Sequence, residues 1–314
     1  MNQHLRDLSL GLPNLNFTNA ADIRDLAAAL GIHEVEIEMV NIITAASDAR
    51  YQKTKSIAVE AALYHLGTGG NRTRARICVE GSKALQLEKN DVIALAACVE
   101  LLHNASLIHD DLHDHEKSRH EKKSVWVQYS PDVAVCAGDL MISCAYVAIS
   151  SVSKPEILPS LLRSIHRSIS NAIQGQCEDL KVRHENALSV DDYVRIVKAK
   201  SGALLALPLE LSLLLSGDIT ASERSIRAAE DFSVGYQIKD DLSDVKEDLG
   251  GEEKPAGLNI ITVMNQIGQY PDAEEEVKTL ARSYFHSSHA IAGELPHGSG
   301  QFLQKLSLQM AQSL

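Results

Sequence analysis

The sequence is short of positive charge, of paired cysteines and of long apolar runs, and each shortage excludes a class of protein. With 30 Lys and Arg against 42 Asp and Glu, the 314-residue chain has a formal net charge of −12. Nucleic acids and anionic membranes attract Lys- and Arg-rich surfaces, so we expect no nucleic-acid partner. The cysteines form no CxxC pair and lie in apolar or helical-looking segments, at Cys78, Cys98, Cys136, Cys144 and Cys177. We interpret them as reduced core residues and expect a cytoplasmic protein.

The most apolar run, at 203–215, is too short to cross a bilayer by itself and contains Pro208 and Glu210. We interpret it as a buried, kinked helix and expect no transmembrane segment. The N-terminus, MNQHLRDLSLGLPNLN, has no basic start followed by an apolar core, so no secretory signal is expected either.

Strand-like alternation is nearly absent, whereas apolar residues recur at helical spacing along most of the chain. Gly31 and Gly217 are typical of helix ends, and Asn90-Asp91 predicts a helix cap. The only substantial internal loop is expected at 248–258. These patterns predict an all-α protein with one domain over 1–314. The expected helices cover about 22–30, 34–47, 51–66, 91–109, 133–152, 156–174, 191–216, 221–246, 272–293 and 299–313.

The apolar segment at 91–109 runs directly into an acidic motif, D-D-L-H-D. On a helix, the carboxylates of Asp110 and Asp114 lie on one face, and Asp111 points about a quarter-turn away. Like charges at that spacing repel, so such a pair needs a cation, and oxygen ligands without cysteine suit Mg²⁺. For a single motif, a solvated acidic helix end is the more ordinary explanation.

The same D-D-x-x-D pattern returns at Asp240, Asp241 and Asp244, again at the end of an apolar helical run. Two carboxylate pairs on separate helices can face each other across a cavity. They can hold several Mg²⁺ ions there, and the ions then bind a polyphosphate. The repetition favours a metal site over two solvated helix ends.

Both motifs belong to an ordered set of short segments. The set comprises GGNRTR (69–74), LLHNASLIHDD (101–111), CAGDLMISCAY (136–146), GQCEDL (175–180), KAKSGALL (198–205) and GYQIKDDLSD (235–244). Over about residues 60–260 it resembles the trans-isoprenyl diphosphate synthases of the polyprenyl synthetase family. The resemblance implies an all-α isoprenoid synthase bundle around a central cavity, usually a homodimer. It also implies that an allylic diphosphate is coupled to isopentenyl diphosphate with Mg²⁺, about three ions together with the substrate diphosphate.

The resemblance also assigns roles position by position. The main metal ligands would be Asp110, Asp114 and Asp240, and the supporting carboxylates would be Asp111, Asp241 and Asp244. The cations that grip the allylic diphosphate would be Arg119, Lys200 and Lys254, and Gln237 would face the reacting allylic end. Because the diphosphate leaves as a multiply charged anion, metal and fixed cations stabilise the charge that develops.

The isopentenyl diphosphate site departs from the family pattern. G-G-K-x-x-R reads G-G-N-R-T-R here, so Asn71 replaces a lysine, although Arg74 remains. R-R-G-K-P-T reads R-H-E-K-K-S, so His120 replaces an arginine, whereas His103 matches a retained polar ligand. Two of four groups are therefore altered. The lost charge could be restored by protonated His120 or by one of three neighbouring cations, Arg72, Lys122 and Lys123.

The residues that precede the first motif bear on product length. Ala105 and Ser106 lie about one helical turn before Asp110. In the family, aromatic side chains there would form a floor that stops products at C15. Small side chains leave room, so a product of about C15–C20 is expected, with geranylgeranyl diphosphate favoured.

Two other hypotheses follow from the same residues. A class I terpene synthase-like enzyme would ionise one allylic diphosphate without a second substrate. Only 4% of residues are aromatic, however, and such enzymes use aromatic rings to stabilise carbocations. A non-catalytic partner subunit is disfavoured because both aspartate motifs are whole. The histidines around the first motif are interpreted as facing solvent or phosphate rather than zinc, at His109, His113, His115 and His120.

Overall fold

The computed structural model describes residues 20–46, 56–182, 188–248, 258–267 and 273–314, and the predicted all-α class is confirmed. The helices are α2 (Ala20–Ala45), α3 (Ile57–Leu66), α4 (Thr73–Ala84), α5 (Lys89–His113), α6 (Val125–Gln128), α7 (Pro131–Ile149), α8 (Leu158–Val182), α9 (Val190–Val197), the π-helical turn η1 (Lys198–Gly202), α10 (Ala203–Ser216), α11 (Ile219–Asp248), α12 (Ile260–Ile267), α13 (Ala273–Gly293), the 3₁₀ turn η2 (Pro296–Gly298) and α14 (Gln301–Gln312). Within these ranges the only strands are β1 (Ser118–Arg119) and β2 (Lys122–Lys123), which pair as a hairpin.

The chain divides into two compact units, and each is described by itself. The first combines Met1–Val79 with Ile93–Ser151, and the second combines Glu80–Val92 with Val152–Leu314. The first aspartate motif lies in the first unit and the second motif in the second. The predictions of a single domain and of a cavity shared by the two motifs therefore stay predictions.

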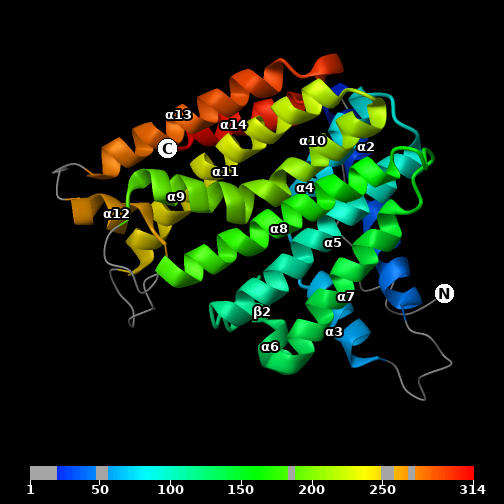
Figure 1. The fold of residues 1–314 in the computed structure, drawn as a ribbon, viewed down its shortest axis with the longest axis horizontal. Helices are drawn as coiled ribbons and strands as arrows, with labels where there is room; N and C mark the ends of the chain where they lie inside the picture. The colour runs from blue at the N-terminus through cyan, green and yellow to red at the C-terminus, as the bar shows by residue number, and fades with distance from the viewer. Residues whose placement is uncertain (1–19, 47–55, 183–187, 249–257, 268–272) are drawn as a thin grey trace. The chain divides into compact units, whose positions relative to one another are not determined.

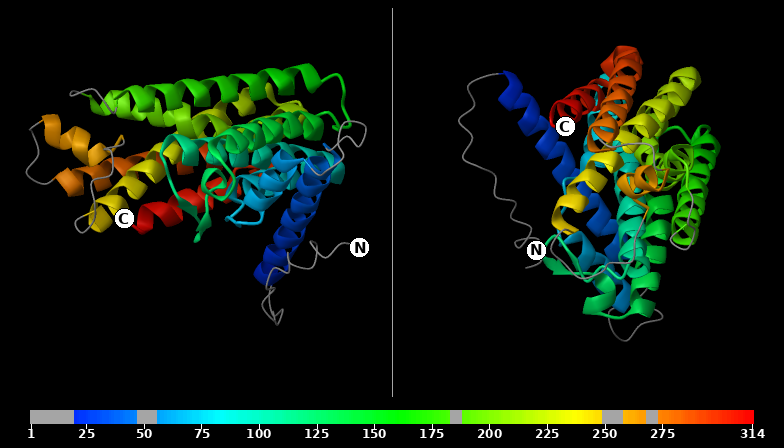
Figure 2. Two further views of the ribbon diagram at one scale, coloured as in Figure 1. Left: turned by 90° about the horizontal axis from the view of Figure 1, so that it is seen from below. Right: turned by 90° about the vertical axis from the view of Figure 1, so that its left-hand side faces the viewer.

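In the first unit, α7 packs against α2, α3 and α6. Its beginning is well specified, because Ser130 accepts a hydrogen bond from the Val133 amide and Pro131 occupies the first turn. The inner face of α7 carries small side chains around Met141, which is fully buried. Helix α7 also contacts the end of α5, because the His109 ring of α5 lies against Gly138 of α7. The first aspartate motif lies at the end of α5, and the hairpin, drawn as arrows in Figure 2, follows in sequence.

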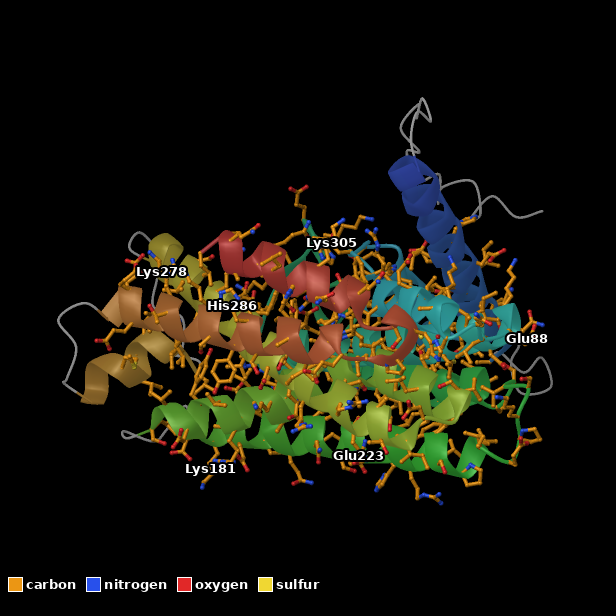
Figure 3. The ribbon with its side chains drawn as sticks, turned by 90° about the horizontal axis from the view of Figure 1, so that it is seen from above. Glu88, Lys181, Glu223, Lys278, His286 and Lys305 are labelled. Atoms are coloured by element: carbon orange, nitrogen blue, oxygen red, sulfur yellow. The ribbon has the colours of Figure 1, made fainter. Side chains whose placement is uncertain are left out.

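In the second unit, α11 packs against both α10 and α13, and α14 packs against α13. Figure 1 shows α13 and α14 side by side, and Figure 3 shows Lys278 and His286 on α13 and Lys305 on α14. Gly235 permits the approach of α11 to α13, since a Cβ there would lie 3.0 Å from the Phe285 ring. Helix α10 is almost entirely buried, as predicted for 203–215.

Several predicted boundaries are wrong. Gly31 does not end a helix, because α2 continues through it as one helix. Asn90 and Asp91 do not precede a helix, because α5 begins at Lys89. Buried Asp91 instead accepts hydrogen bonds from the amide and hydroxyl of Ser153, so it ties α5 to the segment before α8. Gly217 does end α10, with a left-handed φ of 96° that suits glycine.

Sequence periodicity missed three short helices, α4, α6 and α12, and the hairpin of β1 and β2. The cysteine prediction is partly wrong. All five cysteines are free, but Cys136 and Cys177 are exposed rather than in the core. Cys136 lies in an apolar stretch of α7 that gave no sign of exposure, whereas Cys177 lies between Gln176 and Glu178 on α8, polar neighbours that are consistent with an exposed position.

Three helical segments are long and apolar enough to cross a membrane, judged by length and composition alone. They are Lys89–His113, Pro131–Ile149 and the continuous segment Val190–Ser216. The run at 203–215 is too short to span a bilayer by itself, but α9 and η1 extend it into one helical segment of 27 residues. In the first and third segments 72% of the most apolar stretch is buried within the protein, against 44% in α7. Burial in the core accounts for the apolar character of the first and third segments.

Candidate active site

The first aspartate motif has the helical geometry that its spacing predicted. The Asp114 amide donates to the Asp110 carbonyl at 2.9 Å, so the two residues lie one turn apart at the end of α5. Both side chains are partly exposed, whereas Asp111 is only 1% exposed. The motif therefore has two outward carboxylates and one buried carboxylate.

Asp111 is engaged by Arg119, another predicted site residue. The Arg119 Nη2 and Nε atoms lie 2.6 and 3.0 Å from the Asp111 carboxylate oxygens. Burial raises the pKa of Asp111, and Arg119 opposes that rise. Burial, the largest single influence, works against the charged form of Arg119, but the hydrogen bond to Asp111 and the charge of that carboxylate together outweigh burial and raise the pKa of Arg119. This contact fixes the direction of the Arg119 guanidinium group.

The hairpin that carries Arg119 contacts the glycine loop at residues 67–72. Lys122 Nζ donates to the Gly67 carbonyl at 2.6 Å, and the Tyr64 hydroxyl donates to the Lys123 carbonyl at 2.8 Å. The His120 ring lies close to Gly70, with its Cε1 atom 3.6 Å from the position of a Cβ there. The two segments that depart from the family pattern therefore meet at one place in the first unit.

Arg72 does not replace the lysine that is missing at position 71. Its Nε atom donates to Glu36 of α2 at 3.0 Å, and its two Nη atoms donate to the Gly69 and Leu66 carbonyls at 3.1 Å each. The Arg72 side chain is 9% exposed. Its guanidinium group holds the glycine loop, so Arg72 is excluded as the cation that restores the charge lost at position 71.

Arg74 is supported by His103. The two side chains approach to 3.0 Å between Nη1 and Nε2, and arginine has no acceptor, so His103 must accept. Burial, followed by the charge of Arg74, lowers the pKa of His103 well below its ordinary value. Neutral His103 thus orients Arg74 without adding charge of its own.

The second motif places one of its aspartates in the interior. Asp240 is exposed, whereas Asp241 is 3% exposed. Asp241 accepts hydrogen bonds from the Tyr193 hydroxyl at 2.7 Å, from Gln237 Nε2 at 3.0 Å and from the Ile260 amide at 2.9 Å. Burial raises the pKa of Asp241 to about 6, against the pull of these donors. The Asp244 side chain and all of Lys254 lie outside the described residues.

Lys200 lies in the π-helical turn η1 between α9 and α10. Its Nζ atom is 2.7 Å from the carboxylate of Asp179 on α8. Position 175, one turn before Asp179 on α8, requires glycine, because a Cβ on Gly175 would lie 2.3 Å from the Lys200 amide nitrogen. Such π turns are common at functional sites, and here the turn brings the Lys200 backbone against α8.

The remaining predicted residues lie on α5 in the first unit. Ala105 is 1% exposed, and the Ser106 hydroxyl donates to the His103 carbonyl at 2.7 Å. His109, which was expected to face solvent or phosphate, is 26% exposed at its side chain. It also packs in a notch of the neighbouring helix α7, where a Cβ on Gly138 would lie 2.2 Å from its Nε2 atom.

A model of the polyprenyl synthetase family matches residues 55–263, which is about two thirds of the chain. The match includes both aspartate motifs, the glycine loop and the Lys200 turn.

The chain belongs to the polyprenyl synthetase family.

Several relatives share this region. A short chain isoprenyl diphosphate synthase of Methanothermobacter thermautotrophicus is 28% identical over 211 residues, 66% of this chain and 64% of the relative. A (2E,6E)-farnesyl diphosphate synthase of Mycobacterium bovis is 29% identical over 195 residues, 57% of this chain and 53% of the relative. The matched part thus spans less than two thirds of the length of these relatives.

Solved structures support the fold. A geranyltranstransferase of Thermotoga maritima superposes with a TM-score of 0.75 at 23% identity, covering 92% of this chain and 100% of the other. A geranylgeranyl pyrophosphate synthetase of Pyrococcus horikoshii gives a TM-score of 0.77 at 19% identity, covering 91% and 97%. The all-α isoprenoid synthase fold is shared with both.

Polyprenyl synthetases use a divalent metal, and the donors of this chain fit Mg²⁺. Asp110 and Asp114 form an all-oxygen pair one turn apart, and Asp240 provides a further exposed carboxylate. Across the described ranges, no three or more His, Cys, Asp or Glu side chains gather into a ready-made metal cage. Mg²⁺ binds one or two carboxylates and completes its shell with water and substrate phosphate, which fits the pair formed by Asp110 and Asp114. The number of ions stays a prediction.

Sequence reasoning missed three residues that organise this family's motifs here. They are Asp179, Tyr193 and His65, which is buried beside Asn104. Asp179 was visible as the last acidic residue of GQCEDL, and Tyr193 lies seven residues before Lys200 on the short amphipathic helix α9. No sequence signal distinguishes His65.

Proposed function

We propose that this polyprenyl synthetase is a Mg²⁺-dependent trans-prenyltransferase. It would condense an allylic diphosphate with isopentenyl diphosphate to a trans-polyprenyl diphosphate of about C15–C20. The named relatives, which are short chain isoprenyl and farnesyl diphosphate synthases, support this reaction class. The observation that carries the proposal is the difference in burial between neighbouring carboxylates within each aspartate motif. One carboxylate is buried on protein donors, and the neighbouring carboxylate is left facing outward.

The outward carboxylates of Asp110, Asp114 and Asp240 would hold Mg²⁺. When bound, Mg²⁺ would neutralise charge on the leaving diphosphate. Arg119 and Lys200 would contact the allylic diphosphate as fixed cations, because each is already held by a buried or nearly buried carboxylate, Asp111 or Asp179. Cations that are oriented before substrate arrives need little rearrangement as charge develops.

The second-substrate site rests mainly on Arg74. His103 orients Arg74 but stays neutral, Arg72 is used by the loop, and Asn71 carries no charge. His120 lies beside the same loop at Gly70. We therefore expect isopentenyl diphosphate to bind more weakly than at a site with the full set of cations.

Product length would be set on α5. Ala105 is buried and lies five residues before Asp110, so a larger side chain would narrow the space for a growing chain. In Ala105→Phe we expect the main product to become shorter, measured by chromatography of dephosphorylated products. Ser106→Ala, which adds no bulk, is the control. An unchanged product length in Ala105→Phe would show that the floor lies elsewhere.

The decisive assay incubates the protein with Mg²⁺ and with C5, C10, C15 or C20 allylic diphosphates, with and without isopentenyl diphosphate. Elongated products are expected from the wild type. The Michaelis constant for isopentenyl diphosphate should fall roughly tenfold or more in Asn71→Lys with His120→Arg, because each change restores a charged contact to phosphate. Release of diphosphate with a hydrocarbon or alcohol, unaffected by isopentenyl diphosphate even in the double variant, would support the terpene synthase hypothesis instead. A homodimer and a cytoplasmic location are part of the same proposal.

A further inference from the structure

Tyr193 is fully buried in α9, yet its hydroxyl group is polar and must be satisfied there. It donates to Asp241 Oδ2 at 2.7 Å. Burial and the charge of Asp241 raise the pKa of Tyr193 well above its ordinary value, so the hydroxyl stays protonated and acts as a donor. A phenylalanine would fill almost the same volume without this polar requirement.

The Asp241 carboxylate joins three helices through this contact. Oδ2 also accepts from the amide of Ile260, the first residue of α12, and Oδ1 accepts from Gln237 one turn earlier on α11. Asn259 adds a hydrogen bond to the Asp241 carbonyl at 3.3 Å. Asp241 thus serves as a side-chain cap for α12 that comes from α11, and Tyr193 fixes its position from α9.

Two of these helices lead to predicted diphosphate-binding groups close to this junction. Asp240 is the residue next to Asp241 on α11. Lys200 follows Tyr193 by seven residues, and α9 runs directly into the π turn that contains it. The contact of α9 with α11, together with the contact of η1 with α11, therefore determines how far Lys200 lies from Asp240 within the second unit.

We propose that Tyr193 is a positioning residue that sets the spacing between Lys200 and Asp240 for a metal-bound diphosphate group. This inference rests on the proposed function and deepens it. The hydroxyl is not expected to touch substrate, because its oxygen is buried against Asp241. Its removal should leave the fold intact, since Gln237 and the Ile260 amide still satisfy the carboxylate.

The test compares Tyr193→Phe with Tyr284→Phe. Tyr284 lies on α13 in the same unit, and the structure gives its hydroxyl no hydrogen-bond partner among the described residues, so it is a matched control. Calorimetric titration with inorganic diphosphate in excess Mg²⁺ should show roughly three- to tenfold weaker binding for Tyr193→Phe and no change for Tyr284→Phe, since the worth of the internal hydrogen bond, about a factor of ten, limits the affinity that positioning can contribute. The Michaelis constant for the allylic diphosphate should rise similarly, whereas that for isopentenyl diphosphate should not.

Equal diphosphate affinity in wild type and Tyr193→Phe, even with a lower melting temperature, would overturn the inference and leave Tyr193 a purely structural residue. If the wild type binds no magnesium diphosphate, both the inference and the proposed function fail. If Tyr193→Phe does not fold, hydrogen exchange on the wild type decides. Magnesium diphosphate should slow exchange of the Ile260 amide, and unchanged exchange there would overturn the inference.

Discussion

The two aspartate motifs share one sequence pattern but bury their second aspartate against different chemistry. Asp111 pairs with a full positive charge, that of Arg119. Asp241 is held by neutral donors from Tyr193, Gln237 and the backbone of α12. The first arrangement is an ion pair with one partly exposed partner, and the second is a buried hydrogen-bond network.

The difference shows how the same helical pattern serves two purposes. In both motifs the second aspartate is turned about 100° from the first, so an outward first carboxylate places the second toward the protein. In the first unit the inward carboxylate orients a cation on a hairpin. In the second unit the inward carboxylate joins helices through hydrogen bonds. We therefore expect the charge of the carboxylate to matter most in the first motif, and its hydrogen-bond geometry to matter most in the second.

The largest expected effect concerns the outward carboxylates, in which the motifs should behave alike. Asp110→Ala and Asp240→Ala should each lower the rate by several powers of ten, because stabilisation of the leaving diphosphate is the main catalytic contribution. Helical content, measured by circular dichroism, should stay close to that of the wild type. Near-normal turnover of either variant in Mg²⁺ would show that its carboxylate does not hold the metal.

The two motifs should differ in how much the charge of the inward carboxylate contributes to the free energy of unfolding. Asp111→Asn leaves Arg119 without its counter-charge and should lower the free energy of unfolding by about 2–3 kcal/mol, less than for a fully buried pair because Arg119 keeps some contact with water. Asp241→Asn should change it by less than about 1 kcal/mol. The new amide oxygen can still accept from Tyr193 and Ile260, and the Gln237 amide can flip to accept from the new NH₂ group.

Urea denaturation of both variants measures this difference. Equal losses would mean that Arg119 does not depend on Asp111, or that the charge of Asp241 matters as much as its shape. Asp240→Asn serves as the control for a carboxylate-to-amide change at an exposed position.

The aspartate motifs could be read from the sequence because helical spacing fixes which carboxylates share a face. The inward turn of Asp111 and Asp241 could not, because it depends on Arg119 eight residues away and on Tyr193 and Ile260 on other helices. Arg72 shows the same limit. Its sequence position suggested a replacement cation, but its direction is set by Glu36 of α2, 36 residues away. Periodicity gave the long helices, and it failed where a helix is short or runs through a glycine.

The electrostatic character of the first unit gives a pH test. His65 is 2% exposed, is hydrogen-bonded to Asn104 and is flanked by Arg119, Arg72, His103 and His120. Burial, followed by the charge of Arg119, lowers the pKa of His65 to about 3. The unfolded chain binds a proton at His65 below about pH 6.5 and the folded chain does not, so this residue's contribution to stability is lost as pH falls from 6.5 toward 3.

His65→Gln should remove that part of the pH dependence. Between pH 7 and pH 5 the wild type should lose about 2 kcal/mol more in unfolding free energy than the variant, from roughly 1.4 kcal/mol per pH unit. His286→Gln, at an exposed position on α13, should keep the wild-type slope (Figure 3). Parallel slopes for wild type and His65→Gln would mean that His65 takes up its proton in the folded protein as readily as in the unfolded chain.

The smallest expected effect concerns the hairpin that presents Arg119 to Asp111. His120 and Glu121 form its two-residue turn with φ of 48° and 64°, the left-handed region that glycine tolerates best. The family pattern has glycine at the second of these positions, and a side chain there costs about 1 kcal/mol. Glu121→Gly should therefore stabilise the first unit by roughly 0.5–1 kcal/mol, after the greater freedom of glycine in the unfolded chain is subtracted.

Glu121→Ala removes the same carboxylate but keeps a Cβ in the left-handed region, so it isolates backbone strain from charge. A gain in unfolding free energy for glycine and not for alanine would assign the effect to strain. Equal gains would assign it to the carboxylate of Glu121, which lies two residues from Arg119. Because the turn follows Arg119, which pairs with Asp111 of the first motif, the glycine variant should also reduce the loss caused by Asp111→Asn while leaving Asp241→Asn unchanged. A double-mutant cycle measures that coupling, and additivity of Glu121→Gly with Asp111→Asn would mean that the hairpin and the ion pair are independent.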